Sequence, residues 1–267
     1  WIVFNKKRPK DHPWITQKEK KYIISGRHLG RHKDQEGKGL GILQILSYKE
    51  SWAILASRFF LEPIWWLFVG WMPIYLQNTY GFNVKEIGMF AWVPFVGAAV
   101  GSISGGVLRV LEQLNHCKIN VLYIEPDVVL TERWVAMGQS VDKARKRTIW
   151  MGGLLMFLGL VSTILFADGP TKFVIIVAVV LFGFQFAISN IQTMPSDLFS
   201  GKSVGTLAGL GGTVGVLSVI IMNFLIPIIT KTSYTPAFVI IAAFVPLGVF
   251  AVFKLCKEIG PVEIKNQ

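Results

Sequence analysis

Cysteine and histidine are scarce in this chain, which has 2 Cys and 4 His among 267 residues. A structural zinc site takes four ligands of this kind close together. The adjacent residues His116 and Cys117 have no further Cys or His near them in the sequence. We therefore predict no metal and no cofactor. Carboxylates, His and Cys are also not gathered as an enzyme active site would need, so the sequence does not predict an enzyme.

Charged residues are few as well, at 16% of the chain against 52% hydrophobic residues and a mean hydropathy of +0.50. Ordinary soluble domains carry more charge than this. The apolar residues gather into blocks, and six of them are long enough to cross a hydrocarbon core, which takes about 20 residues. These blocks are Trp52–Leu76, Ile87–Leu111, Thr148–Ala167, Lys172–Pro195, Val204–Thr230 and Pro236–Leu255. The sequence predicts an all-α membrane protein.

Basic residues exceed acidic ones, 27 against 16, and give the chain a net charge of +11. With six spans, 23 Lys and Arg fall on one side of the bilayer and three on the other, while Arg58 lies inside the first span. Loops rich in Lys and Arg stay on the cytoplasmic side. We therefore predict both termini in the cytoplasm and no nucleic-acid partner. Cys117 and Cys256 map to that reducing side or its edge, so no disulfide is expected between them.

The chain has no initiating Met and begins with the apolar residues Trp1–Phe4, which the basic stretch 5–8 follows directly. This pattern is typical of the last turn of a membrane helix and its cytoplasmic flank, and not of a signal peptide. The sequence predicts the end of a preceding membrane helix and a cytoplasmic linker over 1–51, a six-helix transmembrane bundle over 52–255 with a long cytoplasmic loop at 112–147, and a cytoplasmic tail over 256–267.

Two charged residues interrupt the first span, because Arg58 and Glu62 stand four residues apart on one helical face. Glu62 lies about 16 Å into the span, where an unpaired carboxylate is costly. It is therefore protonated, paired with Arg58 or exposed to a cavity, whereas Arg58 has the further option of reaching the lipid headgroups. Both are candidates for gating or coupling. Trp66 is a candidate for contact with a substrate, although tryptophans in such spans also serve as packing or interfacial anchors.

The fourth span carries polar residues inside an apolar stretch. Gln185, Ser189 and Gln192 share one face, and Asn190 points about 100° away from Ser189. Polar groups in a span are costly unless they face a protein interior or a water-filled path. Two interpretations stay open: hydrogen bonds between helices, or a lining for a polar substrate formed by Gln185, Ser189 and Asn190. Asp197, at the cytoplasmic edge, is a candidate for capping a helix or gating a loop.

Glycines follow these polar residues at spacings that suit helix contacts. Such spacing lets two membrane helices approach closely. The glycines are Gly201, Gly205, Gly209, Gly211, Gly212 and Gly215, and a similar run on the second span has Gly97, Gly101, Gly105 and Gly106. A passive membrane anchor needs neither buried polar groups nor such surfaces. The combination indicates a protein that handles a polar solute inside the bilayer.

Several segments resemble one known family. SRFFLEPIWW at 57–66 with WMPIYL at 71–76 resembles the seventh helix of the anion:cation symporter branch of the major facilitator superfamily. SVDKARK at 140–146 resembles the basic loop before its ninth helix, and QFAISN at 185–190 with the glycines of 204–215 is similar to its tenth and eleventh helices. The resemblance is nearest to bacterial hexuronate and related sugar-acid transporters, and it reaches from about Trp1 to Phe253.

The resemblance implies twelve helices in two six-helix halves that hold the substrate between them near the midplane. The fold expected for this chain is therefore a six-helix half of a major facilitator superfamily transporter. Its partner is the missing N-terminal six-helix half. In this family the charged residues tied to anion binding and proton coupling lie mainly in that first half.

Residues and resemblance together lead to one hypothesis for function. We expect secondary active transport of a sugar acid or a related organic anion in the bacterial inner membrane, by symport with H⁺ and with Na⁺ as the alternative ion. Gln185, Ser189 and Asn190 would hydrogen-bond the substrate's hydroxyl groups, Trp66 would pack on the sugar, and Arg58 or Glu62 would lie at the cytoplasmic gate. The competing hypothesis is a truncated membrane fragment that does not transport. Which organic anion is moved stays open.

Overall fold

A computed structural model describes residues 16–17, 39–106 and 141–262 of the chain. Within these residues the structure is all-α, and six helical regions are long and apolar enough to cross a membrane. The predicted all-α fold with six spans is confirmed. The predicted helix end at Trp1–Phe4, most of the linker before Gly39 and most of the loop at 112–147 lie outside the described residues.

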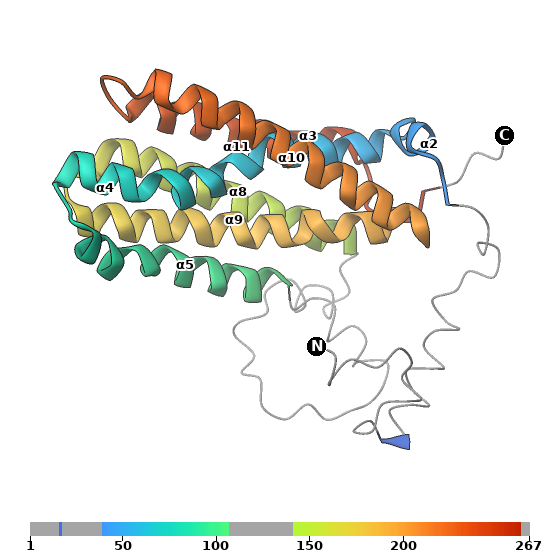
Figure 1. Cartoon of the computed structure of the whole chain (residues 1–267). Coiled ribbons are helices and arrows are strands. Elements are labelled where there is room, and N and C mark those ends of the chain that lie inside the picture. Colours follow the sequence, from blue (N-terminus) through green and yellow to red (C-terminus); the bar gives the residue numbers. More distant parts are fainter. Residues whose placement is uncertain (1–15, 18–38, 107–140, 263–267) are drawn as a thin grey trace.

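The six spans run side by side (Figure 1). The first span, Lys49–Tyr80, consists of α3, a π-helical turn η2 and α4, and each other span is one helix. The elements are α2 (Ile42–Leu46), α3 (Lys49–Trp66), η2 (Leu67–Trp71), α4 (Met72–Tyr80), α5 (Val84–Gly106), α8 (Val141–Phe166), α9 (Pro170–Leu198), α10 (Lys202–Ile229) and α11 (Thr235–Leu255). The π-helical turn lies between Pro63 and Pro73, neither of which can donate a backbone hydrogen bond to the helix.

Helix α8 differs from the sequence expectation at its start. It begins at Val141, so the last residues of the predicted 112–147 loop are helical. Two local features favour this extension. Asp142 stands in the first turn, where a negative charge complements the helix dipole, and its Oδ1 lies 2.7 Å from Nζ of Lys146, one turn further along. The basic cluster of this segment therefore belongs to a helix and not to a loop.

Helix α9 packs closely against α5 and α8 because glycines remove the side chains between them. A Cβ added at Gly97 or at Gly101 of α5 would lie 2.3 Å from a backbone carbonyl oxygen of α9. A Cβ added at Gly152 of α8 would lie 2.6 Å from the carbonyl oxygen of Gly183 in α9. The helices thus approach each other backbone to backbone, as spaced glycines allow.

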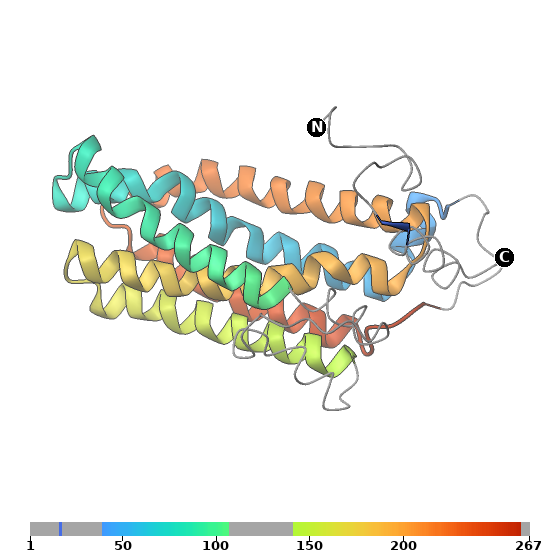
Figure 2. The same ribbon diagram turned by 90° about the horizontal axis from the view of Figure 1, so that it is seen from below.

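The first span packs against α10 on one side and against α11 on the other. Phe60 and Phe244 of α11 meet edge to face with ring centroids 5.4 Å apart, and a Cβ at Gly248 of α11 would lie 2.8 Å from Cγ of Leu61. Helices α8 and α10 lie at opposite edges of the bundle, with α3 and α9 between them (Figure 2). The first span and α9 therefore form the middle of the molecule.

Basic residues gather at the end of the bundle where α3, α8 and α10 begin and where α9 and α11 end, which we call the basic end. The basic residues described there are Lys49, Lys143, Arg145, Lys146, Arg147, Lys202, Lys254 and Lys257. At the opposite end, the described basic residues are Lys85, Lys172 and Lys231. By the positive-inside rule, we expect the basic end to face the cytoplasm. The orientation stays a prediction.

Candidate functional site

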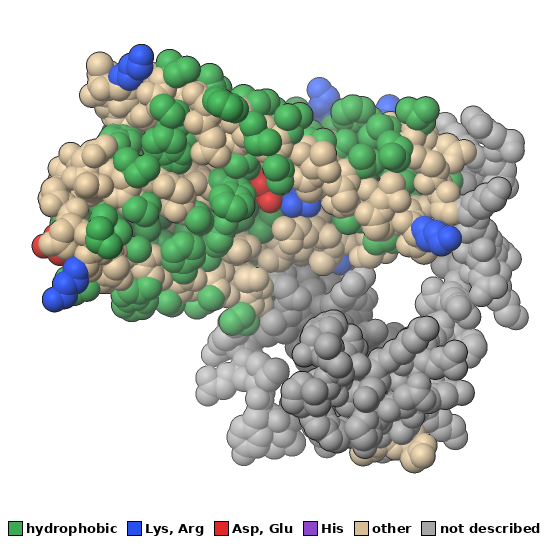
Figure 3. Space-filling model, in the orientation of Figure 1, with side chains coloured by type: hydrophobic (Ala, Val, Ile, Leu, Met, Phe, Trp, Pro, Cys, Tyr) green, Lys and Arg blue, Asp and Glu red, His purple; other side chains and the backbone are tan. Residues whose placement is uncertain are grey.

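Arg58 and Glu62 form an ion pair in the middle of the first span. Nη2 of Arg58 donates to Oε1 of Glu62 at 3.1 Å, and the two side chains are 14% and 16% exposed. Nε of Arg58 and Oε2 of Glu62 are buried and have no hydrogen-bond partner among the described residues. Figure 3 shows acidic and basic atoms side by side near the middle of one face, among hydrophobic and neutral groups. Of the alternatives open from the sequence, pairing is the one found.

The glycines of α10 make room for this ion pair. A Cβ at Gly211 would lie 3.2 Å from Cδ of Arg58, and one at Gly215 would lie 3.2 Å from Cγ of Glu62. By contrast, nothing lies within 4 Å of a Cβ built at Gly205 or Gly209. The glycine run therefore divides into positions that hold the ion pair against α10 and positions that face open space.

An open groove of about 390 Å³ adjoins the ion pair on α10. It is lined by Gly212, Thr213, Val216, Leu217 and Ile220. A Cβ at Gly212 would lie 3.7 Å from Nη1 of Arg58, so the same residue borders both the groove and the guanidinium group. The groove and the guanidinium group of Arg58 are therefore adjacent.

Trp66 follows Arg58 and Glu62 on the same stripe of α3, at successive spacings of four residues, and is 45% exposed. Its neighbour Trp65 points into the bundle and stacks on Phe184 of α9 with ring centroids 5.8 Å apart. This contact brings Trp66 and Gln185, each one residue further along its helix, to the same level of the bundle. Trp65, which was not among the predicted site residues, connects the two predicted parts of the site.

The polar residues of α9 lie on two sides of that helix, as the sequence indicated. Gln185 and Ser189 are half-buried and Gln192 is exposed, whereas Asn190 is only 1% exposed. Oγ of Ser189 donates to the carbonyl oxygen of Gln185 at 2.6 Å, and Nδ2 of Asn190 donates to that of Phe186 at 3.1 Å. In this structure Asn190 is therefore turned into the bundle, away from the more exposed stripe of Gln185 and Ser189.

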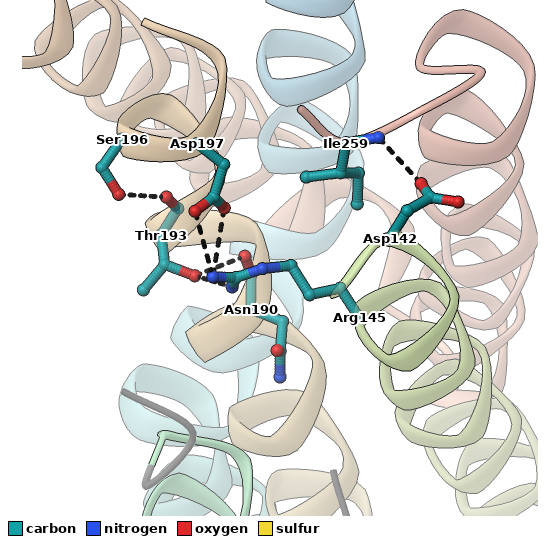
Figure 4. A network of polar contacts seen from close by, with 7 residues as sticks. All are labelled: Asp142, Arg145, Asn190, Thr193, Ser196, Asp197 and Ile259. Atoms are coloured by element: carbon teal, nitrogen blue, oxygen red, sulfur yellow. Dashed lines mark hydrogen bonds and ion pairs between the residues drawn. The ribbon is translucent and has the colours of Figure 1, made fainter. Parts of the chain in front are cut away.

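A second polar cluster joins α8 and α9 at the basic end (Figure 4). Nη2 of Arg145 lies 3.1 Å from Oδ2 of Asp197, and Nη1 of Arg145 donates to Oγ1 of Thr193. The side chains of Arg145 and Asp197 are 7% and 19% exposed. Asp197, expected to cap a helix or gate a loop, pairs with a basic residue 52 positions away. The sequence had placed Arg145 in the basic loop, so only its contact with α9 reveals this pair.

Among the described residues, no group of three or more His, Cys, Asp or Glu is placed to hold a metal ion. The clusters described above offer charged and hydrogen-bonding groups inside an apolar bundle.

The chain is similar to known bacterial transporters along its whole length. A hexuronate transporter of Escherichia coli strain K12 is 29% identical over 269 residues, which cover 100% of this chain and 56% of the relative. A galacturonate transporter of Dickeya chrysanthemi is 38% identical over 122 residues, or 46% of this chain and 34% of the relative. A probable galactarate/D-glucarate transporter of Bacillus subtilis strain 168 is 24% identical over 267 residues, or 97% and 53%.

No protein-family model matches the chain. The relatives are named as transporters and not as enzymes. The chain spans about half the length of the hexuronate transporter that matches all of it. The described residues of this chain hold six candidate membrane spans, and its homologues are transporters of hexuronates and related sugar acids, of the major facilitator type.

Proposed function

We propose that this chain is the C-terminal six-helix half of a symporter that carries a hexuronate or a similar sugar acid across the bacterial inner membrane together with H⁺. The observation that carries the proposal is the Arg58–Glu62 ion pair in the middle of a span, next to the α10 groove. Charged groups at this depth face a polar path or a protein interior. Arginine is also the side chain that best matches the planar geometry of a carboxylate.

The residues near the ion pair suit the rest of a sugar acid. Gln185 and Ser189 are half-buried and offer an amide and a hydroxyl group to sugar hydroxyls. Trp66 offers an exposed aromatic face on the same stripe as Arg58. Asn190 is buried in this structure, so its part in binding requires a rearrangement around α9.

Glu62 provides a route for coupling to H⁺. Its protonation would remove one charge of the ion pair and weaken its hold on Arg58. A substrate carboxylate would then compete more successfully for the guanidinium group, so that proton and anion bind together. Na⁺ is the alternative coupling ion. Asp197 and Arg145 would close the basic end, which the positive-inside rule assigns to the cytoplasm together with both termini.

Uptake in membrane vesicles tests this function. Uptake of labelled glucuronate is measured in vesicles that contain the chain together with its N-terminal half, with and without an imposed proton gradient. We expect accumulation only with the gradient, and Glu62→Gln should lower gradient-driven accumulation at least tenfold while exchange of labelled for unlabelled substrate continues. Asp168→Asn is the matched control, because Asp168 also pairs with a basic residue but is 70% exposed and far from the site. Accumulation that ignores the gradient would refute coupling to H⁺.

Two more variants test the lining on α9. Gln185→Ala and Asn190→Ala should each raise the substrate concentration needed for half-maximal uptake, because hydroxyl groups of the bound sugar would lose a partner. If both variants transport like the parent, the proposed lining is wrong.

A truncated fragment that does not transport is the competing proposal, and the coverage of 56% of the hexuronate transporter fits either candidate. Uptake by vesicles that contain the chain together with its N-terminal half, and the reading frame upstream of the chain, decide between the two. An upstream reading frame for six further spans, together with transport that needs both halves, would support the first proposal. An upstream region without such a frame would support the fragment.

A further inference from the structure

The chain does not leave the bundle where α11 ends. Residues Cys256–Val262, which we call the C-terminal strap, pack against the basic end. Cys256 is 0% exposed and Ile259 is 5% exposed, and both belong to the same apolar cluster as the helices. Neither burial was expected for a cytoplasmic tail over 256–267.

Hydrogen bonds fasten the strap to two helices that it does not follow in sequence. The backbone N–H of Ile259 donates to Oδ1 of Asp142 in α8 at 2.8 Å. The backbone N–H of Val262 donates to the carbonyl oxygen of Leu198, the last residue of α9, at 3.0 Å. The final carbonyl groups of a helix have no partner within it. The strap thus supplies a donor that α9 itself lacks.

Lys146 adds a third fastening. Its Nζ lies 2.7 Å from Oδ1 of Asp142 and also donates to the carbonyl oxygen of Lys257 in the strap. Asp142 therefore accepts from both the strap and its own helix. The strap is thus held by Asp142 and Lys146 of α8 and, independently, by Leu198 of α9.

The hydrogen bond from Ile259 to Asp142 lies near the Arg145–Asp197 ion pair (Figure 4). Asp142 stands three residues before Arg145, on the same side of the first turns of α8. Leu198 follows Asp197 immediately at the end of α9. The strap and the ion pair consequently bridge the same two helix ends, one turn apart.

We infer that the C-terminal strap is a latch on the basic end. The docking of the strap on Asp142 and Leu198 stabilises the Arg145–Asp197 ion pair, and the ion pair stabilises the docked strap. The ends of α8 and α9 separate only when both contacts are released. Each contact fixes the spacing of the helix ends that the other contact needs. Coupling of this kind is reciprocal, so weakening either contact loosens the other by the same factor. The latch does not depend on the transported substrate.

Cys256 reports whether the strap is docked. Burial raises the pKa of its thiol to about 11, and the thiolate is the form that reacts. A docked strap therefore protects this thiol twice, by covering it and by keeping it protonated. An undocked strap exposes it.

The experiment measures alkylation of Cys256 by N-ethylmaleimide at pH 7.5 in membranes. Cys117→Ser in every variant leaves Cys256 as the single cysteine. We expect Asp142→Ala to raise the alkylation rate at least tenfold and Asp197→Asn, which weakens the ion pair on α9, to raise it at least threefold. Asp168→Ala is the control, because its ion pair with Lys172 lies at the opposite end of the bundle. It should leave the rate unchanged.

Ile259→Ala covers the case in which a helix variant fails to fold, because it weakens the strap and leaves α8 and α9 intact. It should raise the Cys256 rate as Asp142→Ala does. In a second background with Cys256→Ser, Ile259→Ala should also speed the labelling of the thiol introduced by Ser196→Cys beside Asp197. If Cys256 is alkylated in both Asp142→Ala and Ile259→Ala at the same rate as in the parent chain, the latch is overturned. Faster labelling in those two but not in Asp197→Asn would overturn its coupling to the ion pair.

Discussion

Gly101→Ala tests the packing of α5 on α9 most directly. The new Cβ would lie 2.3 Å from the carbonyl oxygen of Phe182 and 2.9 Å from its Cα. An ordinary contact between carbon and a carbonyl oxygen is about 3.3 Å, so α5 has to move away by about 1 Å. Backbone atoms cannot rotate aside as a side chain can. We expect a loss of about 1–3 kcal/mol in the free energy of unfolding, the usual cost of overpacking.

Gly88→Ala is the matched control in the same helix, because nothing lies within 4 Å of a Cβ built there. It should be neutral or stabilising by up to about 1 kcal/mol, since alanine favours a helix more than glycine does. Thermal unfolding in detergent, followed by tryptophan fluorescence, measures both variants. A change of 1 kcal/mol shifts the Tm of a domain of this size by about 2–4 °C. Gly101→Ala and Gly88→Ala unfolding at the same temperature would refute the close contact.

The double variant Gly97→Ala with Gly101→Ala sharpens the test. Both positions face carbonyl oxygens of α9 at the same 2.3 Å. Once the first methyl group has pushed the helices apart, the second finds part of its space already made. Substitutions that share one rearrangement are not additive, so the double variant should lose clearly less stability than the two single losses together. Strict additivity would mean that each site relaxes by itself.

Three further outcomes follow from the charged and polar groups. Arg145→Ala should cost up to about 3 kcal/mol, because it leaves the Asp197 carboxylate poorly solvated without the guanidinium group of Arg145. Lys172→Ala, in a pair that is 65% and 70% exposed, should lower the unfolding temperature far less in the same assay. Gly215→Ala should lower uptake of glucuronate more than Gly209→Ala, because only the first methyl group meets Glu62; equal uptake would mean that α10 does not position the ion pair. In the Cys117→Ser chain, alkylation of Cys256 should be slow at pH 7 and rise until about pH 11, since burial raises the pKa of this thiol to about 11; a rate that levels off near pH 9 would indicate an exposed thiol.

Much of the membrane fold could be predicted because its signals are local. An apolar block that can cross a bilayer is visible in the sequence, and the six predicted blocks correspond to the six spans, although 107–111 at the end of the second block lies outside the described residues. The shared face of Arg58 and Glu62 follows from helical periodicity alone, and the structure adds that they pair. The periodicity also separated Asn190 from Ser189 correctly. The start of α8 at Val141 was missed because a charged first turn resembles a polar loop.

The sequence by itself determined the spans, the basic end and the polar stripes, because hydrophobic length, charge and helical period depend only on neighbours along the chain. It could not say which glycine meets which helix, since Gly209 and Gly215 look alike in sequence while only Gly215 meets Glu62. The tertiary structure alone joined Arg145 to Asp197 and the strap to Asp142. Such partners lie far apart in the sequence, and they are chosen by how several equally apolar helix faces pack, for which no local pattern exists.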